Sequence, residues 1–271
     1  VIRQLAGQTL IAVVVSKKQD MQGLYDLLKH QIENFGLFMV INPRKDSVVL
    51  TNNIIHIGGL KNIHLLKDFD LTLTVDSFYQ TNVDIQNKLY NHILSQIENN
   101  EKVINGYSGA GILSAEIAKK AQSVYGIEIN KSAHADAENL KKHNKISNLF
   151  NICGDFFENF KNLTNISNQQ NNQTINNKRK PNNNKTLYNS TLTNNQVCNV
   201  LVLDPSKTGC GKQVMQAICG VEKIIYVSCN PIALAKDLRE IKDEYEITNV
   251  QPFDMFPNTV SVETCVTLIK K

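Results

Sequence analysis

The sequence predicts an α/β protein in which a doubly wound, mostly parallel sheet follows a smaller α+β unit. Three observations carry this prediction. Strand-like and helical segments alternate from Glu101 onward, two strand segments are continuous apolar runs, and the first 76 residues combine short strands with one helical segment. Such alternation is typical of βαβ units, and apolar runs are typical of parallel strands buried on both faces. We expect domains at residues 1–76 and 77–271.

The N-terminal domain is expected to consist of antiparallel strands beside one helix. The chain opens on a strand-like segment, and residues 9–18 are dominated by β-branched apolar side chains. Residues 21–35 carry apolar residues at helical spacing. Further short strands, broken by Asn, Gly and Asp, are expected at residues 36–44, 47–52, 53–59 and 70–76.

The C-terminal domain is expected to alternate strands with helices after a helix over residues 84–97. Each predicted strand ends near a glycine, a proline or a polar residue, which marks the turn that follows. The predicted strands are residues 102–106, 123–129, 149–155, 197–205 and 223–231, and the predicted helices are 112–121, 135–145 and 232–241. The ending, VQPFDMFPN followed by VETCVTLIK, predicts two strands around a loop.

An Asn-rich segment interrupts this pattern at about residues 160–196. It has too few apolar side chains to offset the entropy lost on ordering, so we expect a disordered insertion. The basic run at residues 178–180 could contact RNA, although a solvated loop explains it more simply.

Composition narrows the function classes without choosing one. The 271 residues carry a net charge of +4, which suits a polyanionic partner and is equally common in metabolic enzymes. The chain shows no secretory signal and no apolar run long enough to span a bilayer, so we expect a cytoplasmic protein with no membrane association. None of the six cysteines forms a C-x-x-C pair, which argues against a zinc site or a disulfide framework.

A glycine-bearing turn and a carboxylate suggest a nucleoside cofactor. The turn Tyr107–Gly111 follows one predicted strand and opens a helix, and Glu128 ends the next strand. A G-x-G turn alone fits dinucleotide or S-adenosylmethionine sites, and a carboxylate about twenty residues later commonly binds ribose hydroxyls. Asp155, after the third strand, is either a contact to the adenine or a helix N-cap.

Three further residues stand where an apolar strand meets a turn, and each has a structural alternative. Asp204 ends an apolar strand and either faces a cleft or caps a turn. Cys229 ends another and is either a nucleophile or a buried structural cysteine. Glu263 begins a strand and is either a general base or half of a salt bridge.

The motifs SFYQTN, YSGAG, GIEIN, LDPSKTG, YVSCNP and DMFPNTVSVET together resemble those of the RNA 5-methyluridine methyltransferase family, in order and spacing. The resemblance implies a Rossmann-like methyltransferase domain beside a small central domain. It implies S-adenosylmethionine as cofactor, Cys229 as nucleophile and Glu263 as base. It also implies that a further set of residues holds the cofactor and orients the uracil: Gln80, Tyr107, Glu128, Asp155 and Asp204. No cysteine precedes Cys153, so no iron–sulfur cluster is implied, and no TRAM-type barrel is visible in this chain.

The expected activity is transfer of a methyl group to carbon 5 of a uridine through a covalent cysteine adduct. We expect a monomer without metal that acts on 23S ribosomal RNA rather than transfer RNA, because YSGAG and SFYQTN look more like the ribosomal branch. Asn105, Ser206, Lys207 and Ser261 depart from the Asp, Pro, Arg and His usual in the family. These departures leave a weakened, RNA-binding relative as an alternative. A methyltransferase of another base or of a protein amide is a further alternative, which leaves YVSCNP unexplained.

Overall fold

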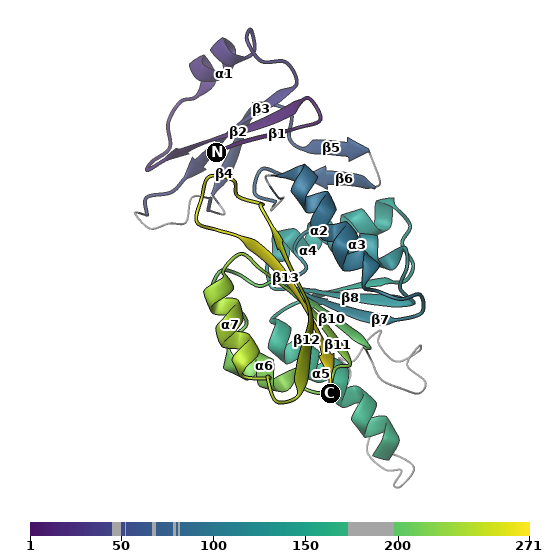
Figure 1. The fold of residues 1–271 in the computed structure, drawn as a ribbon. Helices are drawn as coiled ribbons and strands as arrows, with labels where there is room; N and C mark the ends of the chain where they lie inside the picture. The colour runs from purple at the N-terminus through teal and green to yellow at the C-terminus, as the bar shows by residue number, and fades with distance from the viewer. Residues whose placement is uncertain (45–49, 52, 67–68, 78–79, 81, 173–197) are drawn as a thin grey trace. The chain divides into compact units, whose positions relative to one another are not determined.

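A computed structural model describes most of the chain, which divides into two compact units (Figure 1). One unit comprises Val1–Tyr79 with Ala135–Lys145, and the other comprises Gln80–His134 with Ile146–Lys271. The described residues are 1–44, 50–51, 53–66, 69–77, 80, 82–172 and 198–271.

The first unit contains a four-stranded sheet of order β1-β2-β3-β4 and a separate β5–β6 hairpin. Its core is apolar, with Leu10, Leu37 and Met39 at most 1% exposed. The elements are β1 (Ile2–Leu5), β2 (Gln8–Val15), α1 (Gln22–Leu28), β3 (Phe35–Ile41), β4 (Ile54–Gly59), β5 (Ile63–Leu66) and β6 (Asp70–Leu73).

The prediction of antiparallel strands in this unit is correct for β1–β2 and β3–β4 but wrong for β2–β3, which pair in parallel. The segment between these two strands includes α1 and serves as a crossover, which parallel pairing requires. Helix α1 is shorter than the predicted 21–35, since it ends at Leu28 and β3 begins at Phe35. Strand β5 was not predicted, and the strand expected at residues 47–52 falls largely outside the described residues.

Part of a later helix belongs to this first unit through specific hydrogen bonds. Asp70 donates its backbone N–H to Asn144 Oδ1 at 2.8 Å and accepts from Asn144 Nδ2 at 2.9 Å. Ser77 donates through Oγ to the buried carboxylate of Asp136. These bonds connect residues that are about 60 to 74 positions apart in the chain.

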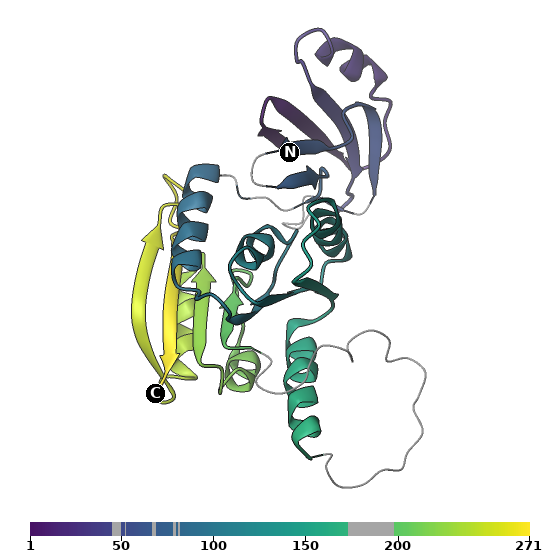
Figure 2. The same cartoon turned by 90° about the vertical axis from the view of Figure 1, so that its right-hand side faces the viewer.

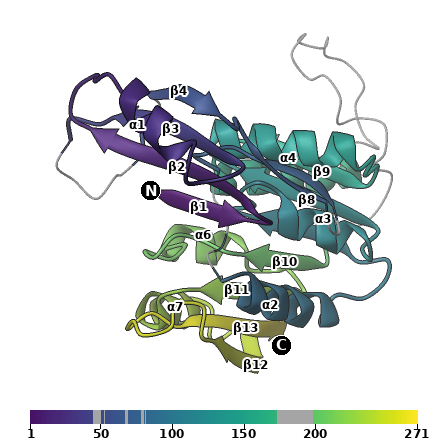
Figure 3. The same cartoon turned by 90° about the horizontal axis from the view of Figure 1, so that it is seen from above.

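The second unit is built on a seven-stranded sheet of order β12-β13-β11-β10-β7-β8-β9 (Figure 3). Strands β7 to β11 pair in parallel, whereas β13 is antiparallel to both β11 and β12. This topology confirms the predicted doubly wound, mostly parallel sheet. The strands are β7 (Lys102–Gly106), β8 (Ser123–Glu128), β9 (Leu149–Cys153), β10 (Val200–Leu203), β11 (Lys223–Ser228), β12 (Tyr245–Phe253) and β13 (Glu263–Lys270).

Helices cover both faces of this sheet. Helix α2 contacts α3, α6 contacts both α5 and α7, and Figure 2 shows α2 and α7 on opposite faces. Asn82 caps α2 and Asn230 caps α7, where Pro231 occupies the first turn as expected for that residue. The helices are α2 (Val83–Ser95), α3 (Ile112–Ala118), α4 (Lys131–His143), α5 (Phe156–Asn172), α6 (Lys212–Ala217) and α7 (Pro231–Arg239).

Helix α5 extends into the segment where the sequence predicted a disordered insertion. Its first turns carry Phe156, Phe160 and Leu163, which are buried in the core at spacings of four and three residues. Apolar spacing of this kind anchors a helix even when many of its other residues are Asn. The rest of the predicted insertion, residues 173–196, lies outside the described residues.

Candidate active site

The ends of several strands bring the candidate residues to one edge of the seven-stranded sheet. The parallel strands β7 to β11 all finish at this edge, and the antiparallel strand β13 begins there. In open α/β sheets, ligands bind beyond the carboxyl ends of the strands. The candidate residues that begin, end or follow these strands within two positions are Tyr107, Glu128, Asp155, Asp204, Cys229 and Glu263.

We call Tyr107–Gly111, Glu128 and Asp155 the glycine-turn half of this edge. Gly109 donates its backbone N–H to Glu128 Oε2 at 2.8 Å, and Asn130 donates its own to Glu128 Oε1 at 2.6 Å. One carboxylate therefore connects the turn after β7 to the residue that precedes α4. Each carboxylate oxygen retains acceptor capacity for a further donor, such as a ribose hydroxyl.

The turn leaves space for a ligand. Gly109 and Gly111 have φ angles of +56° and +79°, which glycine adopts without steric cost. Apart from its immediate neighbours in the chain, a Cβ atom placed on either residue would meet no atom of the described residues within 4 Å, so open space lies in front of the turn. Open space beside a carboxylate suits the ribose of S-adenosylmethionine, whose hydroxyls can donate to Glu128.

Tyr107 and Asp155 flank this turn. The Tyr107 ring packs against Phe156 with ring centroids 5.2 Å apart, and burial raises the pKa of its hydroxyl. Asp155 is exposed, and its Oδ1 accepts from the backbone N–H of Glu158 at 3.1 Å. Asp155 therefore caps α5, in agreement with one of its two interpretations, and its contact to the adenine stays a prediction.

We call Asp204, Cys229 and Glu263 the thiol half. Ser228 on β11 is the register partner of Thr264 on β13, so Cys229 and Glu263 are the next residues along two neighbouring strands. Leu203 pairs with Tyr226, which places Asp204 at the end of the strand beside β11. A thiol and two carboxyl groups thus come from three adjacent strands that are distant in the sequence.

Glu263 is the most buried acid of the site. Its side chain is 3% exposed, and its Oε1 has no hydrogen-bond partner among the described residues. Desolvation, followed by the charge of Asp204, raises the Glu263 pKa from its ordinary 4.5 to about 7. Desolvation also raises the pKa of Asp204, which is half-buried, to about 7. Both groups can therefore gain or lose a proton near neutral pH, as a general acid or base must.

Cys229 is half-buried beside this acid pair. Burial raises the pKa of its thiol, the charge of Glu263 raises it further, and Lys207 lowers it. The adjacent Asn230 accepts from Ile232 N–H through Oδ1 at 3.1 Å and donates through Nδ2 to Lys207 O at 3.0 Å. Asn230 thus holds the backbone of Lys207, and the charge of Lys207 favours the thiolate form of Cys229.

Asp237 holds the other end of the loop between β10 and α6, which carries Lys207. The sequence analysis did not single out this residue. Its carboxylate is 5% exposed and accepts from Cys210 N–H at 2.7 Å, Gly211 N–H at 3.1 Å and Tyr226 Oη at 2.6 Å. Gly209 has a φ of +80°, and a Cβ there would lie 2.5 Å from Asp237 Oδ2. A charged residue four positions after Ala233, on the buried face of α7, was the signal available in the sequence.

Three other residues that the sequence singled out have few contacts that would assign them a role in the site. Gln80 is half-buried between residues that the structure does not describe. Ser206 shares a 2.9 Å hydrogen bond with the Thr208 hydroxyl. Asn105 donates to Ser114 Oγ at 2.8 Å, and its buried Oδ1 has no hydrogen-bond partner among the described residues.

The described part of the chain contains neither a cluster of metal-binding side chains nor a helix that could cross a membrane. No three His, Cys, Asp or Glu side chains converge in a way that would hold a metal ion. None of the described helices combines the length and the apolar composition that crossing a lipid bilayer requires.

Comparison with known proteins gives a family match over nearly the whole chain. A family model described as tRNA (uracil-5-)-methyltransferase matches residues 3–271. An RNA methyltransferase of Caldanaerobacter subterraneus subsp. tengcongensis is 32% identical over 283 residues, covering 100% of this chain and 56% of the relative. One from Halalkalibacterium halodurans is 29% identical over 274 residues, covering 97% and 53%. The chain spans about half the length of these curated relatives.

Solved structures share the fold. The crystal structure of Pyrococcus abyssi tRNA (uracil-54, C5)-methyltransferase in complex with S-adenosyl-L-homocysteine has a TM-score of 0.70 at 19% identity, covering 97% of this chain and 56% of that one. The structure of M. jannaschii tRNA m1G37 methyltransferase has a TM-score of 0.59 at 12% identity, covering 100% and 74%. At these identities the likeness concerns the fold, and it confirms the α/β architecture predicted from the sequence.

Proposed function

Because the chain belongs to the tRNA (uracil-5-)-methyltransferase family, we propose that it transfers a methyl group to carbon 5 of a uridine in RNA through a covalent adduct with Cys229. The observation that carries this proposal is the thiol half. There a half-buried thiol and a buried carboxyl group are the next residues along neighbouring strands, and one carboxyl oxygen has no hydrogen-bond partner among the residues that the structure describes. Carbon 5 of uracil is a poor nucleophile, so the reaction needs one group to activate the ring and another to remove a proton.

S-Adenosylmethionine is the cofactor of this family, and when bound it supplies an electrophilic methyl group. In our proposal Glu128 receives hydrogen bonds from its ribose hydroxyls, and the Tyr107–Gly111 turn faces its amino-acid end. Asp155 would contact the adenine, and Gln80 would complete the set of residues that holds the cofactor. The open space in front of Gly109 supports this assignment, because a bulkier turn would fill it.

Cys229 and Glu263 divide the chemistry of the base. The Cys229 thiolate adds to carbon 6, so that a carbon–sulfur bond forms and the electrons of the ring double bond make carbon 5 nucleophilic. After carbon 5 has gained the methyl group, Glu263 removes the remaining carbon 5 proton, and the carbon–sulfur bond breaks to restore the double bond. A Glu263 pKa of about 7 lets this carboxylate accept the proton at neutral pH.

Asp204 is assigned to the uracil edge. With a pKa of about 7, its carboxyl group can donate to a carbonyl oxygen when protonated and accept from a ring N–H when ionised. Donation to the oxygen of the developing enolate would stabilise the addition step. The target base must be unpaired or flipped out to reach these groups.

Ribosomal RNA is the substrate that we propose, on the basis of the YSGAG and SFYQTN motifs, with transfer RNA as the competing substrate. We place the reaction in the cytoplasm, where the Cys229 thiol would remain reduced. Methylation of ribosomal and transfer RNA transcripts by the purified chain, followed by mass spectrometry of the nucleosides, separates the two substrates.

Covalent trapping tests the mechanism. RNA containing 5-fluorouridine has no carbon 5 proton for Glu263 to remove, so it should form a stable adduct with the wild-type chain in the presence of S-adenosylmethionine. Cys229→Ala should form none, whereas Cys153→Ala, which alters the exposed cysteine at the end of β9, should form as much as wild type. An adduct with Cys229→Ala would exclude this thiol as the nucleophile. Bound RNA with neither product nor adduct would favour a non-catalytic relative.

A further inference from the structure

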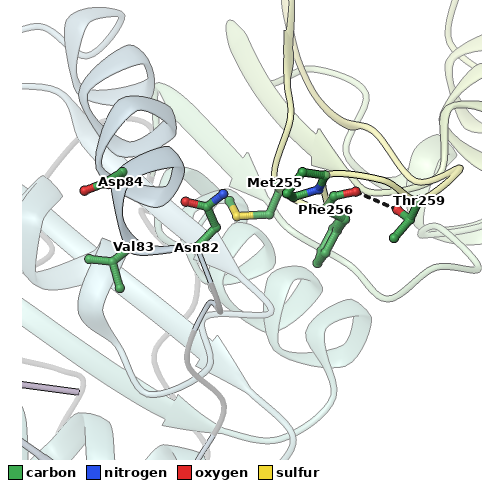
Figure 4. A pocket seen from close by; sticks show the side chains of 7 residues that line it. Asn82, Val83, Asp84, Met255, Phe256 and Thr259 are labelled. Carbon is green, nitrogen blue, oxygen red and sulfur yellow. Dashed lines mark hydrogen bonds between the residues drawn. The ribbon is translucent and has the colours of Figure 1, made fainter. Parts of the chain in front are cut away.

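A hollow lies at the same edge of the sheet and has no role in the chemistry above (Figure 4). Its volume is about 550 Å³, within the range of small-molecule sites. The start of α2 forms one side, and the loop between β12 and β13 forms the other. Its lining includes Asn82, Val83, Asp84, Met255, Phe256 and Thr259.

Topology places this hollow beside the proposed site. The C-terminal end of α2 lies at the opposite edge of the sheet, where Lys223 at the start of β11 donates to Gln96 O at 2.7 Å. The N-terminal end of α2 therefore points to the edge where Cys229 lies. On the other side of the hollow, Phe253 ends β12 and pairs with Glu263, so the loop between them leads directly into the proposed base.

The lining combines an aromatic ring with one oriented amide. Figure 4 shows Asn82 and Met255 pointing toward each other, while the Phe256 ring projects from the opposite loop. Asn82 Oδ1 accepts from Ile85 N–H at 3.2 Å as the cap of α2. Its NH₂ group donates to none of the described residues and can therefore donate to a ligand. Thr259 donates through Oγ1 to Phe256 O at 2.7 Å, so the loop that carries the ring is braced.

The charge of the lining selects the part of an RNA strand that fits. Asp84 contributes a negative charge, and no Lys or Arg is among the described residues that line the hollow. A phosphate group would be repelled there, because phosphate sites in proteins are formed by cations and N–H donors. An uncharged nucleobase has a π face for Phe256 and acceptor atoms for Asn82, and stacking of this kind tolerates any base.

We propose that this hollow binds a nucleobase next to the target uridine, stacked on Phe256 and hydrogen-bonded by the Asn82 amide. The proposal rests on the proposed function, since it takes the strand that presents the uridine to Cys229 as its ligand. It assigns to the β12–β13 loop a second task besides leading into Glu263, namely to hold the strand on one side of the reacting base.

The test uses single-stranded RNAs of about ten nucleotides with one central 5-fluorouridine and 2-aminopurine at one neighbouring position at a time. On the wild-type chain, the fluorescence at one position should be quenched by stacking. Phe256→Ala should abolish that quenching and weaken RNA binding by about 10- to 100-fold, and Phe256→Tyr should restore both. Val260→Ala is the matched control, because Val260 is fully exposed in the same loop and outside the lining.

An abasic nucleotide supplies the second arm. Placed at the quenched position, it should weaken binding to wild type by the same factor and cause no further loss with Phe256→Ala, because both changes remove one contact. The proposal would be overturned if the two losses of affinity were additive, or if Phe256→Ala quenched the fluorescence as strongly as wild type. It would also be overturned if wild type quenched the fluorescence at no position. Quenching that depends on Phe256 in the absence of any adduct or methylated product would instead overturn the proposed function and leave this site standing.

Discussion

The glycine-turn half and the thiol half of the candidate site differ in how their acidic groups are held. In the glycine-turn half, Glu128 and Asp155 already accept hydrogen bonds from backbone N–H groups and lie at the rim. In the thiol half, Glu263 is buried and its Oε1 has no hydrogen-bond partner in the described part of the chain, and Asp204 shares its low-polarity surroundings. A carboxylate that is already hydrogen-bonded suits the steady binding of a ligand, whereas a desolvated one suits proton transfer.

The largest expected effect distinguishes the thiol half, where we propose proton removal, from the glycine-turn half, where we propose cofactor binding. Glu263→Gln should lower kcat for methylation by about 10²- to 10⁴-fold, because it removes the proposed general base. With ordinary uridine, its covalent RNA adduct should accumulate and be visible on denaturing gels. Glu128→Gln should show no such adduct. If Glu263→Gln turned over at the wild-type rate, the proton would be leaving to another group.

The second-largest effect concerns Asp237, which holds the loop between β10 and α6 beside the thiol half. Asp237→Ala should lower the free energy of unfolding by about 2–4 kcal/mol, because it removes the acceptor of the Gly211 N–H and of the Tyr226 hydroxyl and leaves the Cys210 N–H with only its bond to Tyr226 Oη. Urea denaturation measures this loss. Asp243→Ala, at an exposed position, is the control and should stay within about 0.5 kcal/mol of wild type. Equal stabilities for the two variants would show that the loop does not depend on Asp237.

A smaller effect is expected in the glycine-turn half. Glu128→Gln should weaken S-adenosylhomocysteine binding by about tenfold, because a neutral amide replaces a charged acceptor. Calorimetry measures the affinity. Glu158→Gln, on the exposed face of α5, should bind as wild type does. A Glu128 variant with full affinity would exclude the ribose contact assigned to this residue.

The smallest effect is on stability as a function of pH. The Glu263 pKa is raised in the folded state, so the folded chain favours the protonated form. Stability is therefore lost as the pH rises from about 4.5 through about 7. Glu263→Gln removes this loss and should be more stable than wild type by about 1–2 kcal/mol at pH 8, with little difference at pH 4. The opposite trend in thermal unfolding would mean that Glu263 has a charged partner in the folded chain.

Local patterns in the sequence predicted the parallel strands and their order in the chain, because buried strands and amphipathic helices have distinct periodicities. They did not predict the parallel pairing of β2 with β3, or helix α6, whose six residues span less than two turns. Which strands become neighbours depends on tertiary packing, which no single segment encodes.

The site was predicted unevenly for the same reason. The strand ends that carry Glu128, Asp204 and Cys229 are visible in the sequence, because polar residues interrupt apolar runs there. The adjacency of Cys229 and Glu263 depends on the insertion of β13 between β11 and β12, and the family resemblance anticipated it where periodicity could not. The family match confirms that resemblance, and the ribosomal branch stays a prediction. Asp237 was missed because its partners are backbone groups of a distant loop.

The reversed direction of β13 has a consequence for length variation along the chain. One residue added within β13 would shift the register on one side of the insertion, so that either the following side chains would turn to the opposite face of the sheet or Glu263 would move away from Cys229. One residue added at the tip of the preceding loop, near Asn258, would leave the ladder intact. We therefore expect natural variants of this chain to carry insertions and deletions in the loop before Glu263 and none from Glu263 onward in β13.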